Sequence, residues 1–229
     1  MKRVEGLNES MQKNGFFIIK NAFPKEKLLE IKTKIEKHLE KEGVERRWGG
    51  VSSGLTSIEN KNYFKLLESK ELFDRINMTL YGSDKKVIPL GAFAHYNIPS
   101  SWHTDEKKEY KDKELLPYRV AIYLQNHEDN NQGLWVVPTS HKDFFVKGRL
   151  LLLFKKQQYT KTKFGDLIVF DLRLLHRGWK PSFSYYLTYL FSFLVPTKAF
   201  KKSYRLFLKG QYSCQKKDKT SLFMTFGLA

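Results

Sequence analysis

Three side chains in this sequence could together bind a metal ion, namely His103, Asp105 and His176. In an extended segment, residues two apart point to the same face, so the imidazole of His103 and the carboxylate of Asp105 can converge on one ion. His176 follows an apolar stretch at residues 167–175, which predicts a strand that delivers this imidazole to the same ion. Two histidines and one carboxylate suit Fe(II), because positions remain open for exogenous ligands, whereas zinc more often occupies a closed or three-ligand tetrahedral site.

Two helices and a series of strands are expected to position these residues. Residues 15–23 are rich in β-forming side chains and predict a short strand. Helices are predicted over residues 25–41 and about 60–81, because apolar residues recur there at three- and four-residue steps. Further strands are expected at residues 87–97, 118–125, 134–137, 167–175 and 184–195. Helices followed by strands without intervening helices indicate an α+β domain built on an antiparallel sandwich or barrel.

The length of 229 residues fits a single domain spanning residues 1–229. Within it we expect an N-terminal helical part at about residues 24–82, a barrel at about 85–196 and a basic C-terminal segment at about 197–229. The single cysteine, Cys214, cannot form an intramolecular disulfide, so nothing argues for an oxidising compartment. No apolar run is long enough for a signal peptide or a membrane span, and the expected location is the cytoplasm.

The net charge is strongly positive, because 41 Lys and Arg residues stand against 24 Asp and Glu residues and leave +17. Such a charge attracts nucleic acid, acidic membranes and anionic small molecules without choosing among them. A solvated, lysine-rich surface is the simplest account. We find no aromatic-rich basic motif of the kind that forms a single-strand platform, so no specific nucleic-acid partner is expected.

Four stretches, in the same order along the chain, resemble the phytanoyl-CoA dioxygenase family of Fe(II)/2-oxoglutarate oxygenases. They are residues 15–20 with the helix at 25–41, the motif Trp102-His103-Thr104-Asp105, residues 133–141 and residues 165–178. The resemblance implies a double-stranded β-helix, a cupin-like jelly-roll barrel with N-terminal helices packed on one sheet. It also implies Fe(II) and 2-oxoglutarate as cofactors, dioxygen as cosubstrate, and the three residues above as metal ligands. His141 matches a turn motif and is expected to be structural.

The chain departs from the family at the arginine that binds the distal carboxylate of 2-oxoglutarate. At its usual place stands Tyr186, with Thr188 two residues later. An unpaired anion in a closed pocket is costly, so another cation is needed. Arg119 is the expected replacement, with hydroxyls from Tyr186 and Thr188, similar to the lysine arrangement of the related Jumonji-like hydroxylases. Arg177 and Lys180 are rival cations, while Arg119 could instead bridge a surface carboxylate and Tyr186 could be a core aromatic.

The resemblance implies an enzyme that oxidises a small-molecule substrate. Related halogenases leave the carboxylate ligand position empty for chloride, so Asp105 favours hydroxylation, desaturation or cyclisation. An anionic metabolite, an acyl conjugate and an acidic glycan all fit the basic, aromatic-rich composition, and the oligomeric state is open. Two other classes stay open: a barrel that binds ligands without turnover, given the missing arginine, and an oxidative demethylase acting on nucleic acid, which the charge allows.

Overall fold

The computed structural model describes residues 6–41, 46–47, 50–54, 70–82, 85–96, 102–105, 117–127, 133–142, 155–178 and 220–228. The helices of this part are α1 (Leu7–Asn14), α2 (Lys25–Lys41) and α4 (Lys70–Tyr81). The strands are β1 (Phe16–Ile19), β2 (Arg46–Arg47), β3 (Gly50–Gly54), β4 (Val87–Tyr96), β5 (Tyr118–Tyr123), β6 (Trp135–Val136), β7 (Gln158–Tyr159), β8 (Leu167–Asp171), β9 (His176–Arg177) and β10 (Thr220–Leu228). Among these elements, no helix combines the length and the apolar composition that crossing a membrane requires.

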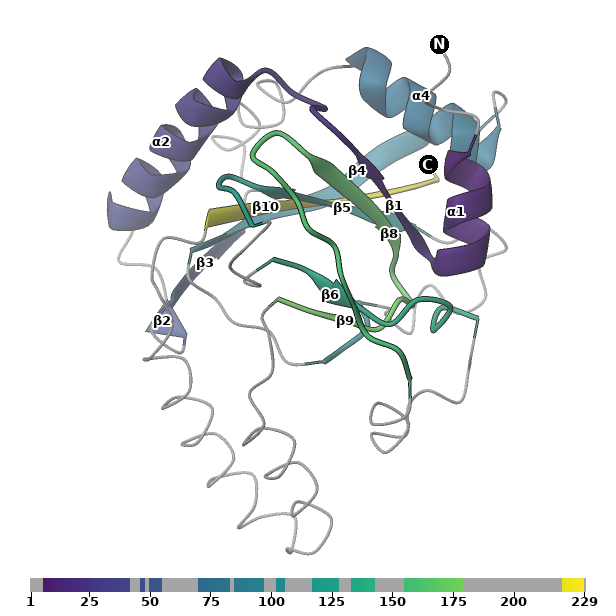
Figure 1. Ribbon diagram of the computed structural model, residues 1–229. Coiled ribbons are helices and arrows are strands. Elements are labelled where there is room, and N and C mark those ends of the chain that lie inside the picture. Colours follow the sequence, from purple (N-terminus) through teal and green to yellow (C-terminus); the bar gives the residue numbers. More distant parts are fainter. Residues whose placement is uncertain are drawn as a thin grey trace, which may run out of the picture.

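The elements form three layers, with helices on one face of a large sheet and a small sheet against the other (Figure 1). The described strands of the large sheet follow the order β1-β8-β5-β10-β4-β3-β2, and those of the small sheet the order β7-β6-β9. Every pairing between them is antiparallel. This combination confirms the predicted α+β class. The two sheets are not joined by pairing of the described strands, so a closed jelly-roll barrel stays a prediction.

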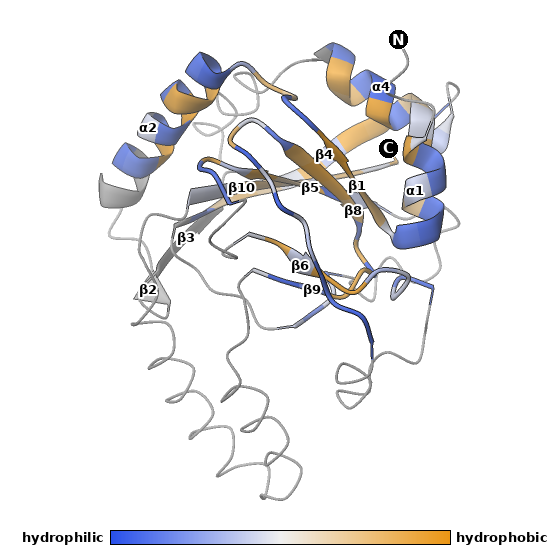
Figure 2. Ribbon diagram, in the orientation of Figure 1, coloured by the Kyte–Doolittle hydropathy of each residue, from blue (hydrophilic) through white to orange (hydrophobic). Residues whose placement is uncertain are grey.

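The core between the helices and the large sheet follows from the apolar stripe predicted for α2. Leu28, Ile31 and Ile35 of this stripe are fully buried. They belong to one cluster with side chains of the sheet such as Val120 and Leu222. Figure 2 shows the same division in α2, whose apolar residues alternate around the helix with charged ones. Burial of this stripe fixes the helix on the sheet, because most helical stability in proteins comes from packing of an amphipathic face.

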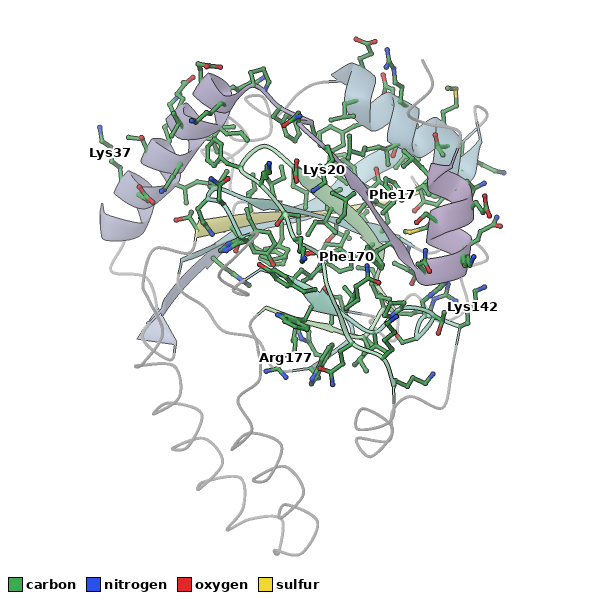
Figure 3. The ribbon with its side chains drawn as sticks, viewed as in Figure 1. Phe17, Lys20, Lys37, Lys142, Phe170 and Arg177 are labelled. Atoms are coloured by element: carbon green, nitrogen blue, oxygen red, sulfur yellow. The ribbon has the colours of Figure 1, made fainter. Side chains whose placement is uncertain are left out.

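Alternation along the strands gives the large sheet a second, different face. In β1, Phe17 joins the helix-side cluster, whereas Phe16 lies in a separate cluster with Phe170 of β8 and Val136 of the small sheet. In Figure 3, the labelled Phe17 lies on the side of the helices and the labelled Phe170 lies between the two sheets. Because successive side chains of a strand point to opposite faces, each strand contributes both to the helix-side core and to the space between the sheets.

The helices differ from the sequence prediction in two places. The second predicted helix, at about residues 60–81, is described as α4 from Lys70 onward, and residues 60–69 lie outside the described part. Helix α1 was not predicted, because only Leu7 and Met11 of its polar sequence pack against the core. Its end is set by Gly15, whose φ of 81° is left-handed and whose N–H bonds the Met11 carbonyl at 2.9 Å.

Strand β10 corrects the predicted limits of the sheet. The sequence division ended the barrel at residue 196 and assigned residues 197–229 to a basic segment, yet Thr220–Leu228 pairs with β4 on one side and β5 on the other. The basic character comes from residues 198–219, which hold eight Lys and Arg and one Asp. The following nine residues carry no charge and eight of them are buried, as befits a strand in the interior of a sheet. The predicted strand at residues 184–195 lies outside the described residues.

The strand predicted at residues 167–175 is shorter than expected, and this changes how His176 is delivered. Strand β8 ends at Asp171, whose Oδ1 accepts the backbone N–H of Arg173 at 2.8 Å. The Leu174 N–H then bonds the Asp171 carbonyl at 2.9 Å. Short polar side chains that accept a backbone N–H two residues on favour turns over strands. The chain therefore leaves the large sheet, and His176 begins β9 of the small sheet.

Candidate metal centre

Backbone pairing brings the two histidines of the predicted triad together. His103 and His176 form an antiparallel bridge in which each N–H bonds the carbonyl of the other at 3.0 Å. Asp105 is fixed separately, because its N–H bonds the Leu172 carbonyl at 2.8 Å, in the turn after β8. The main chain thus positions all three residues without help from their side chains.

The side chains of the triad point at one another. One ligand atom from each of His103, Asp105 and His176 lies within 4.8 Å of the other two. Nε2 of His103 is 3.5 Å from Asp105 Oδ1, and Nε2 of His176 is 3.4 Å from Asp105 Oδ2. The exposed fractions of the three side chains are 39%, 12% and 4%, so the cluster opens on the side of His103. This arrangement leaves one face accessible to exogenous ligands.

His176 has the tautomer that a metal ligand requires. Its Nδ1 lies 2.9 Å from the Leu174 carbonyl, which can only accept, so Nδ1 carries the proton and Nε2 presents its lone pair to the cluster. Burial, followed by the proximity of His103, lowers the pKa of His176 to about 4. The imidazole is therefore neutral at pH 7. The ring of Phe170 lies 4.8 Å from the imidazole and restricts its orientation.

Asp105 is ionised despite its burial. Burial would raise the pKa of its carboxyl, but His176, a hydrogen bond from His103 and the charge of Arg119 together hold that pKa well below its usual range. Oδ2 accepts no hydrogen bond among the described residues, although Nη1 of Arg119 lies 2.7 Å away as an ion-pair partner. A buried carboxylate oxygen without a hydrogen bond among the described residues, facing the lone pair of His176 Nε2, fits a divalent metal.

Arg119 lies at the edge of the triad, on the face of β5 that looks toward the small sheet. Its Nε donates to the hydroxyl of Thr225 in β10 at 3.2 Å, and its guanidinium lies 4.9 Å from the ring centre of Phe93 in β4. One partner of this cation is thus the candidate ligand Asp105, which is mostly buried, whereas a surface carboxylate was the alternative considered from the sequence.

The rival cation Arg177 is separated from the triad by strand alternation. His176 faces the cluster, and the next residue points to the other side of β9, where the guanidinium lies 5.1 Å from the ring centre of Trp102. Figure 3 labels Arg177 at the small sheet. It is fully buried. Tyr186, Thr188 and Lys180 lie outside the described residues, so their predicted roles stay predictions.

Thr225 was not among the site residues predicted from the sequence, and the register of the sheet places it directly opposite Arg119. The available signal was the uncharged run at residues 220–228, which contains β-forming Thr and Phe residues. The charge of the preceding residues led to the whole segment being assigned as a basic extension. His141, expected to be structural, is buried and lies apart from the triad, with Nε2 3.1 Å from the Gln12 carbonyl.

Solved structures share this fold at low sequence identity. The carbocyclase SnoK from nogalamycin biosynthesis, described as non-heme and α-ketoglutarate dependent, superposes with a TM-score of 0.69 at 11% identity, over 98% of this chain and 84% of that one. HygX from Streptomyces hygroscopicus, solved with nickel and 2-oxoglutarate, gives a TM-score of 0.66 at 12% identity, over 99% and 87%. EctD from S. alaskensis, solved with 2-oxoglutarate and 5-hydroxyectoine, gives 0.64 at 13%, over 96% and 74%.

At the level of sequence, no curated protein matches the chain. Residues 11–180, however, match the family described as phytanoyl-CoA dioxygenase. That range includes His103, Asp105 and His176, and it covers most of the chain. It confirms the resemblance inferred from the four ordered motifs, and this chain belongs to the phytanoyl-CoA dioxygenase family.

Proposed function

We propose that the protein is an Fe(II)- and 2-oxoglutarate-dependent dioxygenase whose metal is held by His103, Asp105 and His176. The observation that carries the proposal is the convergence of these ligand atoms within 4.8 Å on a backbone already bridged between the two histidines. Membership of the phytanoyl-CoA dioxygenase family supports it. The 2-oxoglutarate seen in HygX and EctD, which share the fold, supports the choice of cosubstrate.

Three protein ligands on one side of the ion suit iron, because the other side stays open. When bound, the iron supplies the activation of dioxygen, with 2-oxoglutarate as the co-reductant that is oxidised to succinate and carbon dioxide. The protein contributes fixed ligands: Nε2 of His176 is presented by the bond from Nδ1 to Leu174, and the carboxylate of Asp105 is kept ionised by its cationic and imidazole neighbours. Phe170 and Phe223 line the space between the sheets with apolar surface that limits access of water.

The distal carboxylate of 2-oxoglutarate is proposed to bind Arg119, with Tyr186 and Thr188 as the hydroxyl donors expected from the sequence. Arg119 supports this role because it is mostly buried and lies beside the triad, 2.7 Å from Asp105. A guanidinium carries five N–H donors in a planar fork, so one contact with Asp105 is compatible with recognition of a second carboxylate. Thr225, 3.2 Å from Nε of Arg119, is a further hydroxyl suited to the same anion.

The substrate is proposed to be a small metabolite, a glycan or an acyl conjugate, with hydroxylation as the outcome. The net charge of +17 favours an anionic substrate, because a positive surface raises the local concentration of anions. Asp105 completes the triad, which favours turnover over a barrel that only binds. It also favours transfer of oxygen over halogenation, for which the carboxylate position would be empty.

Anaerobic titration tests this proposal directly. We expect the protein to bind one equivalent of Fe(II), and later addition of 2-oxoglutarate to produce the visible metal-to-ligand charge-transfer band of a chelated 2-oxo acid. His103→Ala is the best disruptive variant, since this ligand is the most exposed of the three and its loss costs the least packing. His127→Asn is the matched control, because it removes a buried imidazole outside the cluster. Equal iron binding by both variants, or no band with unmodified protein, would refute the proposal.

A further inference from the structure

The turn at residues 172–175, here called the ligand turn, connects β8 to β9 and contacts two of the three candidate ligands through its carbonyls. The Leu172 carbonyl accepts the N–H of Asp105 at 2.8 Å. The Leu174 carbonyl accepts Nδ1–H of His176 at 2.9 Å. A shift of this short segment would therefore move the Asp105 backbone and release the His176 ring at the same time.

The start of the ligand turn is held by contacts between Asp171, the last residue of β8, and Arg173. Asp171 accepts the N–H of Arg173 and pairs with its guanidinium, with Nη2 2.7 Å from Oδ2. Further along the turn, the constraint comes from a distant part of the chain. The N–H of Leu175 donates to the hydroxyl of Ser140 at 2.9 Å, and both residues are buried. The Leu175 carbonyl accepts the Val137 N–H at 2.9 Å.

Ser140 belongs to a second turn, at residues 138–142, here called the brace turn. The brace turn is closed by the bond from the Ser140 N–H to the Val137 carbonyl at 3.2 Å. It is anchored to the end of α1, because the Thr139 N–H bonds the Asn14 carbonyl at 3.2 Å. His141 packs against Gly15 so closely that a Cβ there would lie 2.5 Å from Nδ1 of the imidazole.

We propose that Ser140 is a positioning residue for the metal centre. Its hydroxyl connects the brace turn to the ligand turn. By holding the ligand turn, Ser140 also holds the Leu174 and Leu172 carbonyls that contact His176 and Asp105. This inference rests on the proposed metal-binding role of the triad and extends it to a residue that touches neither metal nor ligand side chain. Loss of the hydroxyl would leave the buried N–H of Leu175 without its acceptor, and the turn would shift toward another partner or toward water.

The physical expectation is a loss of metal affinity larger than the loss of fold. Removing groups that orient a metal ligand typically weakens metal binding about 10- to 100-fold. Ser140 acts one bond further out, so we expect Ser140→Ala to weaken Co(II) binding by about 10-fold, the lower end of that range. The d–d absorption of the bound Co(II) should change as well, because the angle of the His176 imidazole is no longer fixed.

The experiment compares four variants by Co(II) titration and visible absorption in the full-length protein. Ser140→Ala removes the acceptor, and Ser140→Cys retains a weak one of similar size, so it should fall between Ser140→Ala and the unmodified protein. Thr160→Val is the matched control, because Thr160 is equally buried and its hydroxyl bonds the Leu134 carbonyl at 2.9 Å, not the ligand turn. His103→Ala tests the metal site itself.

Each outcome decides the inference. Weakened binding and an altered spectrum in Ser140→Ala, partial recovery in Ser140→Cys and neither change in Thr160→Val support it. Unmodified affinity and spectrum in Ser140→Ala overturn it, as does an equal effect of Thr160→Val, which would indicate a general response to a lost buried bond. If Ser140→Ala does not fold, Ser140→Cys decides by the same criteria. Retention of Co(II) by His103→Ala would instead refute the proposed metal site and not the brace.

Discussion

The two faces of the large sheet use the same strands for opposite purposes. In β5, Val120 and Ile122 point to the helices and are completely buried among apolar side chains. Arg119 and Tyr123, one position away, point to the small sheet, where Arg119 pairs with Asp105. The first face packs against the buried apolar stripe of α2, and the second lies at the candidate metal centre. One set of backbone hydrogen bonds therefore supports both faces.

This division shows how the protein can hold charges in its interior. A buried cation or carboxylate is costly unless paired and hydrogen-bonded, and the face toward the small sheet gathers such groups in one network of Arg119, Asp105, His176 and Thr225. The helix side of these strands supplies the apolar burial that stabilises the fold. Substitutions on the face toward the small sheet should therefore change ligand binding, and substitutions on the helix side should change the stability of the fold.

The largest effect is expected at the face toward the small sheet, from His176→Ala. The variant should lose stoichiometric Fe(II) binding while keeping its far-ultraviolet circular dichroism, because the ligand-carrying backbone is bridged independently of the side chain. Added imidazole should restore part of the binding, since the substitution leaves a space of that shape next to Phe170. Full Fe(II) occupancy in His176→Ala without imidazole would remove this residue from the centre.

A substitution on the helix side of the large sheet should lower the stability of the fold and leave the affinity for Fe(II) unchanged. Ile122→Ala leaves a cavity in the helix-side core and is expected to lower the free energy of unfolding by about 2–5 kcal/mol in urea denaturation. The Fe(II) dissociation constant of the folded variant should equal that of the unmodified protein. An Fe(II) affinity that falls in parallel with stability would mean that the two faces are not separable.

The same two faces explain which parts of the fold could be predicted from sequence. The stripe of Leu28, Ile31 and Ile35 and the alternation in β5 are local patterns, and the structure confirms the elements that they predict. The pairing of His103 with His176 and the position of β10 between β4 and β5 depend on contacts between distant parts of the chain. No local periodicity encodes such contacts. Residue types and spacing were enough to suggest that His103, Asp105 and His176 bind one ion, and the resemblance to a family supported that grouping.

The errors at β8 and β10 have separate causes. Residues 167–175 are apolar enough to continue as a strand, but Asp171 and Arg173 form a local turn that competes with it. Residues 220–228 have a clear β-forming composition that was outweighed by the basic residues before them. In both cases the missed feature contacts the candidate site, since the first is the ligand turn and the second carries Thr225.

An intermediate effect is expected from Arg119, whose substitution tests whether the face toward the small sheet binds 2-oxoglutarate. Arg119→Met should weaken 2-oxoglutarate binding about 10- to 150-fold, the equivalent of losing a hydrogen bond to a charged group, measured by anaerobic titration of the charge-transfer band. Fe(II) should still bind. Arg119→Lys should recover part of the loss, because charge returns without the bidentate fork.

Arg177 and Lys180 serve as comparisons for Arg119. Arg177 points to the opposite side of β9 and stacks on Trp102, so Arg177→Ala should affect 2-oxoglutarate less than Arg119→Met does. If Arg177→Ala or Lys180→Ala causes the larger defect and Arg119→Met none, the cation that binds 2-oxoglutarate belongs to the segment beside His176.

The smallest effect is expected from Thr225, and it distinguishes two possible sources of the hydroxyl. Thr225→Val keeps the shape of the side chain and removes one neutral hydrogen-bonding group, so 2-oxoglutarate binding should weaken by about 2- to 12-fold. Thr225→Ser should retain the affinity. Thr188→Val, at the position expected from the sequence, is the direct comparison. Because Thr225 lies opposite Arg119 in the register and accepts from its Nε, we expect Thr225→Val to have the larger effect. A larger effect of Thr188→Val would instead assign the hydroxyl that contacts 2-oxoglutarate to the segment after His176, and Thr225 would then serve only to hold the guanidinium of Arg119.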